Sequence, residues 1–428
     1  MADKREIYSV SKMEADITRR HFLLHLPIAL IVGSSVGSAK NEGEYDEYAG
    51  WRKIRGIKTG FFHTQRIGGR WWFVTPQGHG FFSMGVNTVH YAAEWDRVPA
   101  PPADPAKWAE FVSTELRGWG FNTVGAWSAK ELYHTHIAYS PVLNLAASFQ
   151  DLWLKGDVVD YFSAEFHETA DRVAKEECAS YARDPWLLGY FTDNELHWGA
   201  DWRSQKSVLE LYLEMPQNSP GFERAIGFLK RRNKTPGNLS EEDRLDFQEI
   251  AANEYARVCH EAVRRYDPNH AIIGCRLAGV DGTPVEPVAR GLAPYFDVID
   301  YHSYDRQAPV GVLERITRAS GKPTMISEFS FRAMDSGLPN TKGPGEPVGT
   351  QEERAKVFAD YAGTLASLPN CIGYHWFQYR DEPKQGRSLD GENSNYGVVK
   401  INGLPWETLT RRMKRTNFGL YPRAAAAS

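Results

Sequence analysis

Short apolar runs alternate with longer amphipathic runs from residue 57 to near the end of the chain. Such alternation predicts strand–helix units and a parallel sheet. Eight apolar runs qualify as strands: Gly80–Asn87, Phe121–Ser128, Ala138–Ala146, Leu187–Glu195, Ala271–Ala278, Phe296–Tyr304, Pro323–Phe331 and Cys371–Tyr379. Eight parallel strands with intervening helices predict an α/β fold, a (β/α)8 TIM barrel.

The pattern also predicts how the rest of the chain is organised. A hairpin that turns at Gly68-Gly69 precedes the first strand, and we expect it to close the barrel floor. Capping signals at Thr350 and Ser240 predict helix starts, and a last helix is expected over Trp406–Asn417. We therefore expect one catalytic domain over residues 57–420, with an insertion at about 200–239.

The N-terminal segment is set apart from this domain. It has a paired Arg19-Arg20, an apolar run of about 15 residues from Phe22 and small residues before a polar stretch. Residues 1–39 therefore resemble a twin-arginine signal peptide, which predicts a periplasmic or extracellular protein. An uncleaved anchor or a chance apolar segment are the alternatives, although the run is shorter than the roughly 20 residues that span a bilayer.

Composition narrows the class of ligand. A net charge of −4 provides no basic field for nucleic acid or for an anionic membrane surface. Thirteen tryptophans among 428 residues are many, and a neutral carbohydrate is compatible with both features. The four cysteines are far apart without metal-ligand spacing, so buried free thiols are expected and no metal or cofactor is implied.

Polar side chains follow several of the predicted strands, at the barrel end where active sites form. Glu195 ends the fourth strand and Glu328 ends the seventh. Two carboxyls about 5–5.5 Å apart suit retaining glycoside hydrolysis, in which one is the nucleophile and the other the acid/base. Other polar residues at strand ends are Asp193, Asn194, Tyr301, His302, Tyr304, His375, Trp376, Gln378 and Tyr379, and Asn87 ends the first strand.

Four blocks together resemble one family: "GGRWWFVTPQGHGFFSMGVN", "YFTDNELHWG", "ISEFSFRA" and "GYHWFQYRDEP" followed by "DGENSNYGVV". From about Gly60 to Asn402 the chain resembles the β-agarase-type family of the retaining (β/α)8 glycoside hydrolases. The resemblance implies that Asn194 binds sugar, Glu195 is the acid/base and Glu328 the nucleophile. It nominates Tyr301, His302 or Tyr304 to contact the nucleophile, and Trp376 as the floor of a sugar subsite.

Further candidates are the tryptophans at or beyond strand ends, whose rings can stack on a sugar: Trp127, Trp198, Trp202 and Trp376. Trp71 and Trp72 in the hairpin are expected in the core, and the "DGENSN" loop, Asp390–Asn395, is expected to line the cleft.

The sequence therefore predicts an exported retaining hydrolase of β-linked galactans or β-galactosides, with an oligo- or polysaccharide substrate, no nucleic-acid partner and no stable membrane association. A hydrolase or transglycosylase of β-glucans or other β-glycosides remains an alternative, as does a catalytically dead sugar-binding barrel. Sugar identity, internal or terminal cleavage and oligomeric state are left open.

Overall fold

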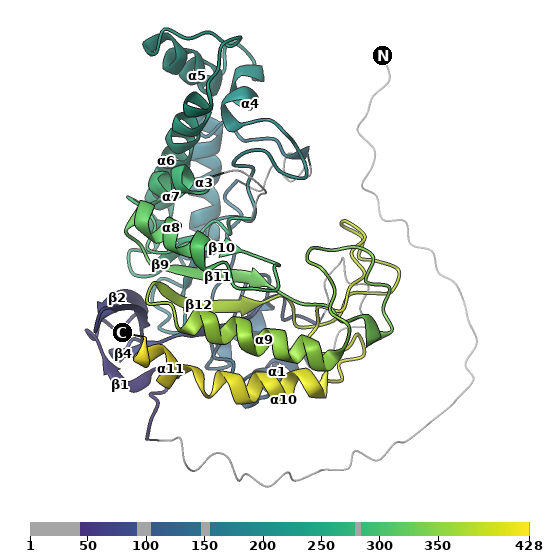
Figure 1. Cartoon of the computed structure of the whole chain (residues 1–428). Coiled ribbons are helices and arrows are strands. Elements are labelled where there is room, and N and C mark those ends of the chain that lie inside the picture. Colours follow the sequence, from purple (N-terminus) through teal and green to yellow (C-terminus); the bar gives the residue numbers. More distant parts are fainter. Residues whose placement is uncertain (1–42, 92–103, 147–154, 279–283, 428) are drawn as a thin grey trace, which may run out of the picture. The chain divides into compact units, whose positions relative to one another are not determined.

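The computed structural model describes residues 43–91, 104–146, 155–278 and 284–427 (Figure 1). The predicted signal peptide, residues 1–39, lies outside these residues. No helix of the described part is long and apolar enough to cross a membrane. All four cysteines are described, and each is buried as a free thiol, as expected.

A four-stranded antiparallel sheet begins the described chain. Its order is β1-β4-β3-β2, with bounds Trp51–Arg55 (β1), His63–Ile67 (β2), Arg70–Val74 (β3) and His79–Phe81 (β4). The predicted hairpin is β2 and β3, joined by Gly68 and Gly69 with φ of 59° and 84°. Glycine suits this turn because side chains rarely tolerate positive φ. As expected, Trp72 is fully buried.

Eight parallel strands follow, and each predicted segment contains one. They are β5 (Ser83–Val86), β6 (Thr123–Val124), β7 (Ala138–Tyr139), β8 (Gly189–Phe191), β9 (Ala271–Gly274), β10 (Ile299–His302), β11 (Thr324–Phe329) and β12 (Cys371–Trp376). Six form a sheet in the order β10-β11-β12-β5-β6-β7, and β8 pairs with β9. Isolated parallel bridges join Tyr139 to Leu187 and Leu277 to Tyr301.

The strands are shorter than the sequence pattern predicts. The run Gly80–Asn87 is divided between β4, which pairs antiparallel with β1 and β3, and β5, which pairs parallel with β12 and β6. Both halves are apolar, so the pattern does not reveal the break. Several other runs end early because the chain leaves the strand, as at Trp127, Glu195 and Arg276, which have φ of 56°, 48° and 56°.

Helices separate and follow the strands. Their bounds are Pro105–Gly118 (α1), Ala164–Cys178 (α3), Val208–Glu214 (α4), Pro220–Arg231 (α5), Glu241–Tyr266 (α6), Glu286–Leu292 (α7), Val310–Ser320 (α8), Gln351–Ala366 (α9), Glu407–Asn417 (α10) and Leu420–Ala426 (α11). Short 3-10 helices span Lys130–His134 and Met334–Ser336. The helices α4 and α5 lie in the expected insertion.

The predicted helix starts are present. Ser240 caps α6, and both hydrogen bonds of the capping box with Asp243 form. Thr350 caps α9 through the Glu353 amide, but the Glu353 carboxylate accepts from Gly349 instead of Thr350. The helix expected over Trp406–Asn417 is α10, which begins one residue later with Trp406 as its N-cap. It is not the last helix, because α11 follows it.

Inward side chains of the parallel strands form one cluster with the N-terminal sheet. Ile273, Met325 and Ile372 belong to it together with Phe73 and Phe81. The intervening strand positions point toward the helices and belong to the larger core. Burial of apolar surface from the N-terminal sheet and the parallel strands in one cluster stabilises their contact, by about 25 cal/mol per Å² of buried surface.

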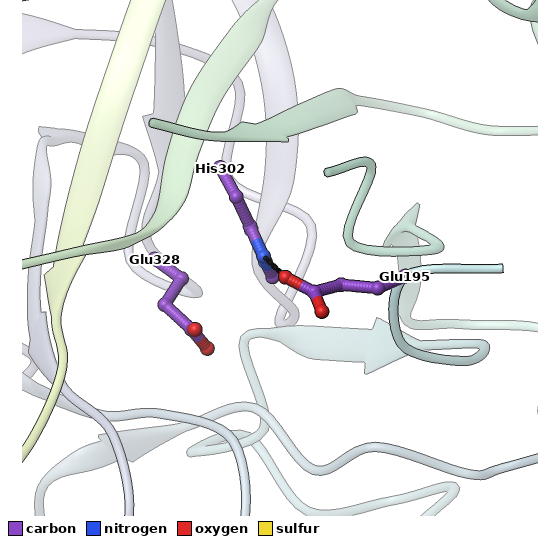
Figure 2. Close-up of side chains that lie close together, drawn as sticks. All are labelled: Glu195, His302 and Glu328. Carbon is purple, nitrogen blue, oxygen red and sulfur yellow. Dashed lines mark hydrogen bonds and ion pairs between the residues drawn. The ribbon is translucent and has the colours of Figure 1, made fainter. Parts of the chain in front are cut away.

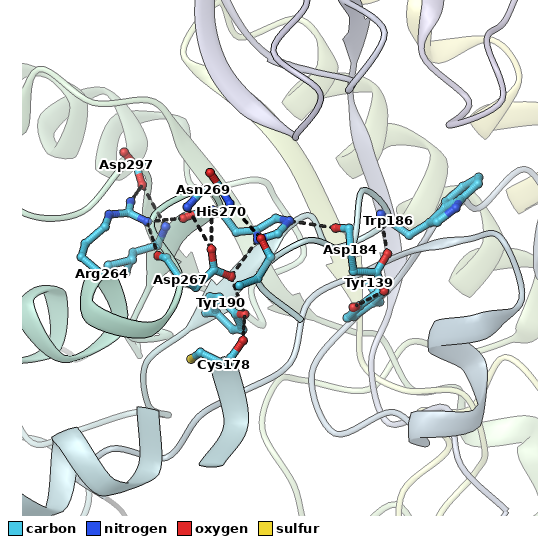
Figure 3. Close-up of polar contacts among 12 residues, drawn as sticks. Tyr139, Cys178, Asp184, Trp186, Tyr190, Arg264, Asp267, Asn269, His270 and Asp297 are labelled. Carbon is cyan, nitrogen blue, oxygen red and sulfur yellow. Dashed lines mark hydrogen bonds and ion pairs between the residues drawn. The ribbon is translucent and has the colours of Figure 1, made fainter. Parts of the chain in front are cut away.

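A buried polar chain links the segments that precede β8 and β9 (Figure 3). Asp267 accepts a hydrogen bond of 2.7 Å from the Tyr190 hydroxyl, and its carboxylate lies 2.7 Å from His270 Nδ1. His270 Nε2 lies 2.8 Å from the Asp184 carbonyl, and the Asp184 carboxylate accepts from Tyr139. Each buried polar group therefore has a partner, which offsets its loss of hydration.

Candidate active site

Glu195, His302 and Glu328 converge from three different strands (Figure 2). Glu195 follows β8, His302 ends β10 and Glu328 lies in β11. One carboxylate oxygen of Glu195, one of Glu328 and one ring nitrogen of His302 all lie within 4.8 Å of one another. The two carboxylates thus face each other, as their positions at the ends of strands four and seven predict.

Glu328 is held by two partners. The Tyr304 hydroxyl donates a hydrogen bond of 2.6 Å to its Oε1, and the Arg276 guanidinium forms an ion pair with Oε2. Of the tyrosines nominated from the sequence, Tyr304 is therefore the one that donates to this carboxylate. Both contacts hold the carboxylate in one position, as attack on a single carbon atom requires.

Arg276 is a site residue that the sequence analysis missed. Its guanidinium is fully buried, donates from Nε to Asn194 Oδ1 at 2.8 Å and packs over the Trp127 ring, 4.5 Å from the centroid. It is the charged residue of the fifth predicted strand, "AIIGCRLA". A polar side chain at the end of an apolar run is the signal that identified the other candidates, and Arg276 shows the same signal.

Burial raises the pKa of Glu195, although its side chain keeps 21% of its accessible surface. The positive charges of Arg203, Arg276 and Arg387 oppose this shift. Burial, with a smaller contribution from the Asp201 charge, therefore favours the protonated form of Glu195, as a general acid requires.

His302 lies against Glu195, with 2.8 Å between Nδ1 and Oε1. Burial, together with a smaller contribution from the Arg276 charge, lowers the pKa of His302 to about 3, against the opposing charge of Glu328. The imidazole is therefore neutral near pH 7; with its proton assigned to Nδ1, it donates to the Glu195 carboxylate. Of the strand-six residues nominated to contact the nucleophile, Tyr304 binds Glu328, whereas His302 binds Glu195.

The three converging side chains could also approach a metal ion, since carboxylate and imidazole are common ligands. The Arg276 guanidinium paired with Glu328 opposes a second positive charge at this place. Hydrolysis by two carboxyls and water requires no metal.

Trp376, expected to be the floor of a sugar subsite, is instead a core residue. It is fully buried, and its Nε1 donates to the Tyr396 carbonyl at 2.9 Å. Its ring packs on Phe329 and Phe358, on the helix side of β12. Side chains alternate between the two faces of a strand, and Trp376 points outward.

The following residue, Phe377, was not a candidate and lies at the site. Its ring centroid is 6.4 Å from that of Tyr304, which holds Glu328, and 5.8 Å from that of Tyr396. The Arg387 guanidinium lies over the same ring, at 5.8 Å. Its position next to Trp376 in the eighth strand could have suggested it.

Other candidates are also structural. Trp198 packs among Tyr161 and Tyr255 and is 6% exposed, so it cannot stack on a sugar. Asp193 is fully buried and accepts from the Ala146 amide and the Tyr255 hydroxyl. These two side chains point into the core because strand ends are covered by the loops that follow them.

Asn87 and Gln378 are buried as well. Asn87 bonds the Ser327 carbonyl and the Ala126 amide, so it joins three strand ends. Gln378 is 1% exposed, and neither atom of its amide group has a hydrogen-bond partner among the described residues. Trp127 remains partly exposed, with Arg276 over its ring.

The loop that contains "DGENSN" contributes an ionic cluster near the site. Arg387 lies 2.6 Å from Asp390, 3.0 Å from Glu392 and 3.7 Å from Glu382. Burial raises the pKa of Glu382 and of Glu392. Figure 1 shows the loops after β11 and β12 beyond the arrowheads of these strands, where they extend the active-site end.

Sequence comparisons relate the chain to agarases. β-Agarase B of Vibrio sp. (strain JT0107) is 27% identical, and the match covers 87% of this chain and 50% of that protein. β-Agarase A of the same strain is also 27% identical, over 81% of this chain and 39% of that protein. The chain thus spans half or less of the length of these relatives. No family model matches it.

Solved structures agree with this relation. A crystal structure of an agarase, AgWH50C, has a TM-score of 0.76 and 26% identity, covering 89% of this chain and 66% of that chain. The structure of an exo-β-agarase has a TM-score of 0.75 at 22% identity, covering 90% and 68% of the two chains. A GH2 β-galacturonidase from Eisenbergiella tayi shares the fold alone, with a TM-score of 0.51, 12% identity, and coverage of 84% and 54%. The resemblance expected from the sequence is confirmed, and the chain is a distant homologue of the GH50 β-agarases.

Proposed function

We propose that the chain is a retaining glycoside hydrolase that cleaves β-linked galactans or β-galactosides. The observation that carries the proposal is the facing pair of Glu195 and Glu328, which have carboxylate oxygens within 4.8 Å of each other. This separation favours retention, because inverting enzymes keep their carboxyls about 6.5–9.5 Å apart to admit a water molecule.

The proposed reaction has two steps. Glu195 protonates the glycosidic oxygen while Glu328 attacks the anomeric carbon, so the leaving sugar departs and a glycosyl-enzyme forms. Glu195, now ionised, takes a proton from water, which attacks the same carbon and releases Glu328. The anomeric configuration is inverted twice and is therefore retained.

The neighbouring side chains support this division of roles. Arg276 and Tyr304 bind the Glu328 carboxylate and hold it in position for attack. Burial favours the protonated form of Glu195. Arg276 also holds Asn194 through its Oδ1, and we propose that the Asn194 amide nitrogen binds the 2-hydroxyl of the sugar at the reacting carbon.

The galactan substrate rests on the relatives, which are named as agarases. We test it by measuring reducing-sugar release from agarose, porphyran, plant β-galactan and β-glucan, with aryl β-galactosides and β-glucosides alongside. The expected result is faster cleavage of a galactan or β-galactoside than of any β-glucoside. The inverse order would favour a β-glucosidase, and binding without any hydrolysis would favour a catalytically dead barrel.

The architecture that we propose is a closed eight-stranded barrel within residues 57–420, with the N-terminal sheet as its floor. The strand β1 of that sheet and most of α11 lie outside these bounds. The bridges from Tyr139 to Leu187 and from Leu277 to Tyr301 support closure, since they connect the two parallel sheets at both junctions. Phe73 and Phe81 of the N-terminal sheet share a cluster with inward strand residues, which supports the floor. Residues 200–239, with α4 and α5, remain the proposed insertion over strand four.

We further propose that residues 1–39 export the protein to the periplasm or beyond. The paired Arg19-Arg20 before an apolar run supports this proposal. An extracellular site of action agrees with a polymeric substrate, which is too large to enter a cell intact.

A further inference from the structure

Trp202 lies in the loop between β8 and α4 and exposes 74% of its surface. No other large hydrophobic side chain of residues 43–91, 104–146, 155–278 and 284–427 is as exposed; Ile57 and Phe111 follow with 63% and 62%. An indole has a broad apolar face and one polar N–H group, so an exposed Trp ring can stack on the apolar face of a ligand. The surroundings of this ring identify what it could bind.

The loop that carries Trp202 is held rigidly by its neighbour Asp201. The Asp201 carboxylate accepts from the backbone amides of Arg203 and Ser204 at 2.7 Å and 3.1 Å, and from Arg203 Nε at 3.0 Å. It also lies 3.2 Å from His197 Nδ1. Since 1% of the Asp201 side chain is exposed, this network is internal to the loop. The ring is therefore presented to solvent on a fixed backbone, which lowers the entropy lost on binding.

The same loop is joined directly to the proposed acid/base. Arg203 Nη1 donates a hydrogen bond of 2.9 Å to the backbone carbonyl of Glu195. The guanidinium of Arg203 also lies over the Trp202 ring, 5.6 Å from its centroid. One side chain thus contacts both residues, so the Trp202 ring lies on the Glu195 side of the site.

The Glu195 side has a chemical meaning in the proposed reaction. The acid/base must lie beside the glycosidic oxygen, whereas the nucleophile lies beside the anomeric carbon. A loop that adjoins Glu195 therefore borders the path of the leaving part of the substrate. Sugars of a polymer on that side lie beyond the bond that is cut.

We propose that Trp202 is a stacking platform for a sugar unit of the polysaccharide on the leaving-group side. The apolar C–H face of a galactose ring would lie on the indole, while Asp201 and Arg203 beneath it hold the loop in place. A single ring suits one sugar better than a protein partner, whose interface buries more than about 1,000 Å². This inference rests on the proposed function and adds that the site selects long substrates.

The test compares Trp202→Ala, Trp202→Phe and wild type on agarose, on neutral agaro-oligosaccharides of increasing length and on a chromogenic aryl β-galactoside. We expect Trp202→Ala to lower kcat/KM on agarose roughly tenfold, mainly through a higher KM, because remote binding is lost. The loss should shrink as the oligosaccharide shortens and be smallest on the aryl substrate. Trp202→Phe keeps an aromatic face and should retain most of the activity on agarose.

Phe111→Ala is the matched control, since it removes an aromatic ring that is 62% exposed on α1. It should leave kcat/KM unchanged on all three kinds of substrate. A loss for Trp202→Ala that is equal on all substrates would assign Trp202 a structural role through Arg203 and overturn the inference. An unchanged KM on agarose would overturn it too. A wild type that cleaves no β-glycoside would instead refute the proposed function, and the inference with it. Thermal melting of each variant establishes that it is folded.

Discussion

The imidazole of His302 and the carboxylate of Glu195 form one hydrogen-bonded unit, with 2.8 Å between Nδ1 and Oε1. Because burial lowers the pKa of His302 to about 3, the ring acts near neutral pH as a dipolar donor and carries no charge. It stabilises the ionised form of Glu195 and so works against the burial that raises the pKa of this carboxyl.

His302→Phe keeps the ring volume and removes this donor. The ionised form of Glu195 then loses a partner, so the pKa of Glu195 should rise further. The alkaline limb of the kcat/KM profile, which reports loss of the acid's proton, should move to higher pH. We expect kcat/KM at the optimum to fall roughly tenfold or more. A pH profile on an aryl glycoside measures both effects, and an alkaline limb displaced to lower pH would contradict this role.

Glu195→Gln should separate substrates by their leaving groups. The amide cannot donate an acid proton, so cleavage of poor leaving groups such as sugars should slow by about 10²–10⁴-fold. An activated aryl group departs without a proton, so its first step should slow far less. Kinetics on a polysaccharide and on a dinitrophenyl glycoside provide the comparison. Equal losses on the two would argue against Glu195 as the acid/base.

Glu328→Gly should abolish the first step, with a loss of roughly 10⁴-fold or more. Azide fits the space left by the carboxylate and should restore turnover, yielding a glycosyl azide of inverted configuration. In the wild type, proton NMR should show a first-formed product that keeps its anomeric configuration, and a fluorosugar should label Glu328. An inverted first product, or labelling of another residue, would exclude the two-step mechanism.

Asp267 should make stability depend on pH (Figure 3). Burial raises the pKa of this carboxyl, but the contacts with His270 and Tyr190 outweigh it and hold the pKa below its ordinary value. A depressed folded-state pKa contributes stability above the unfolded-state pKa, and this contribution is lost as the pH falls through the folded-state value. Asp267→Asn should lower the free energy of unfolding at pH 7 by about 3–5 kcal/mol and flatten its decline in acid.

Tyr190→Phe is the milder companion variant. It removes one hydrogen bond to Asp267 and leaves the His270 contact, so it should cost about 1 kcal/mol and keep most of the acid dependence. Urea unfolding at neutral and acidic pH measures both variants. An Asp267→Asn protein as stable as the wild type at pH 7 would show that the network contributes no stability.

Arg19→Lys together with Arg20→Lys should block export if the N-terminal segment is a twin-arginine signal. The uncleaved protein should then accumulate in the cytoplasm, whereas the wild-type protein should begin near Lys40 outside it. Cell fractionation with N-terminal sequencing measures both. A folded, uncleaved wild-type protein in the cytoplasm of its native host would end this proposal.

Local sequence patterns determined most of the elements of this protein. All eight strand segments were visible as apolar runs, since a buried strand requires apolar side chains on both faces. The starts of α6 and α9 were visible at Ser240 and Thr350, because capping is a contact within one helical turn. Glu195 and Glu328 stood out as acidic residues at the ends of such runs.

The tertiary structure decided which strand-end side chains face the site. Trp376 points toward the helices, whereas the adjacent Phe377 lies beside Tyr304, and a shift of one residue along a strand reverses the face. Arg276 became a site residue through contacts with Asn194 and Glu328, which lie 82 and 52 positions away in the chain. Propensity and periodicity are local, whereas burial, ion pairing and pKa depend on neighbours that only the folded chain brings together.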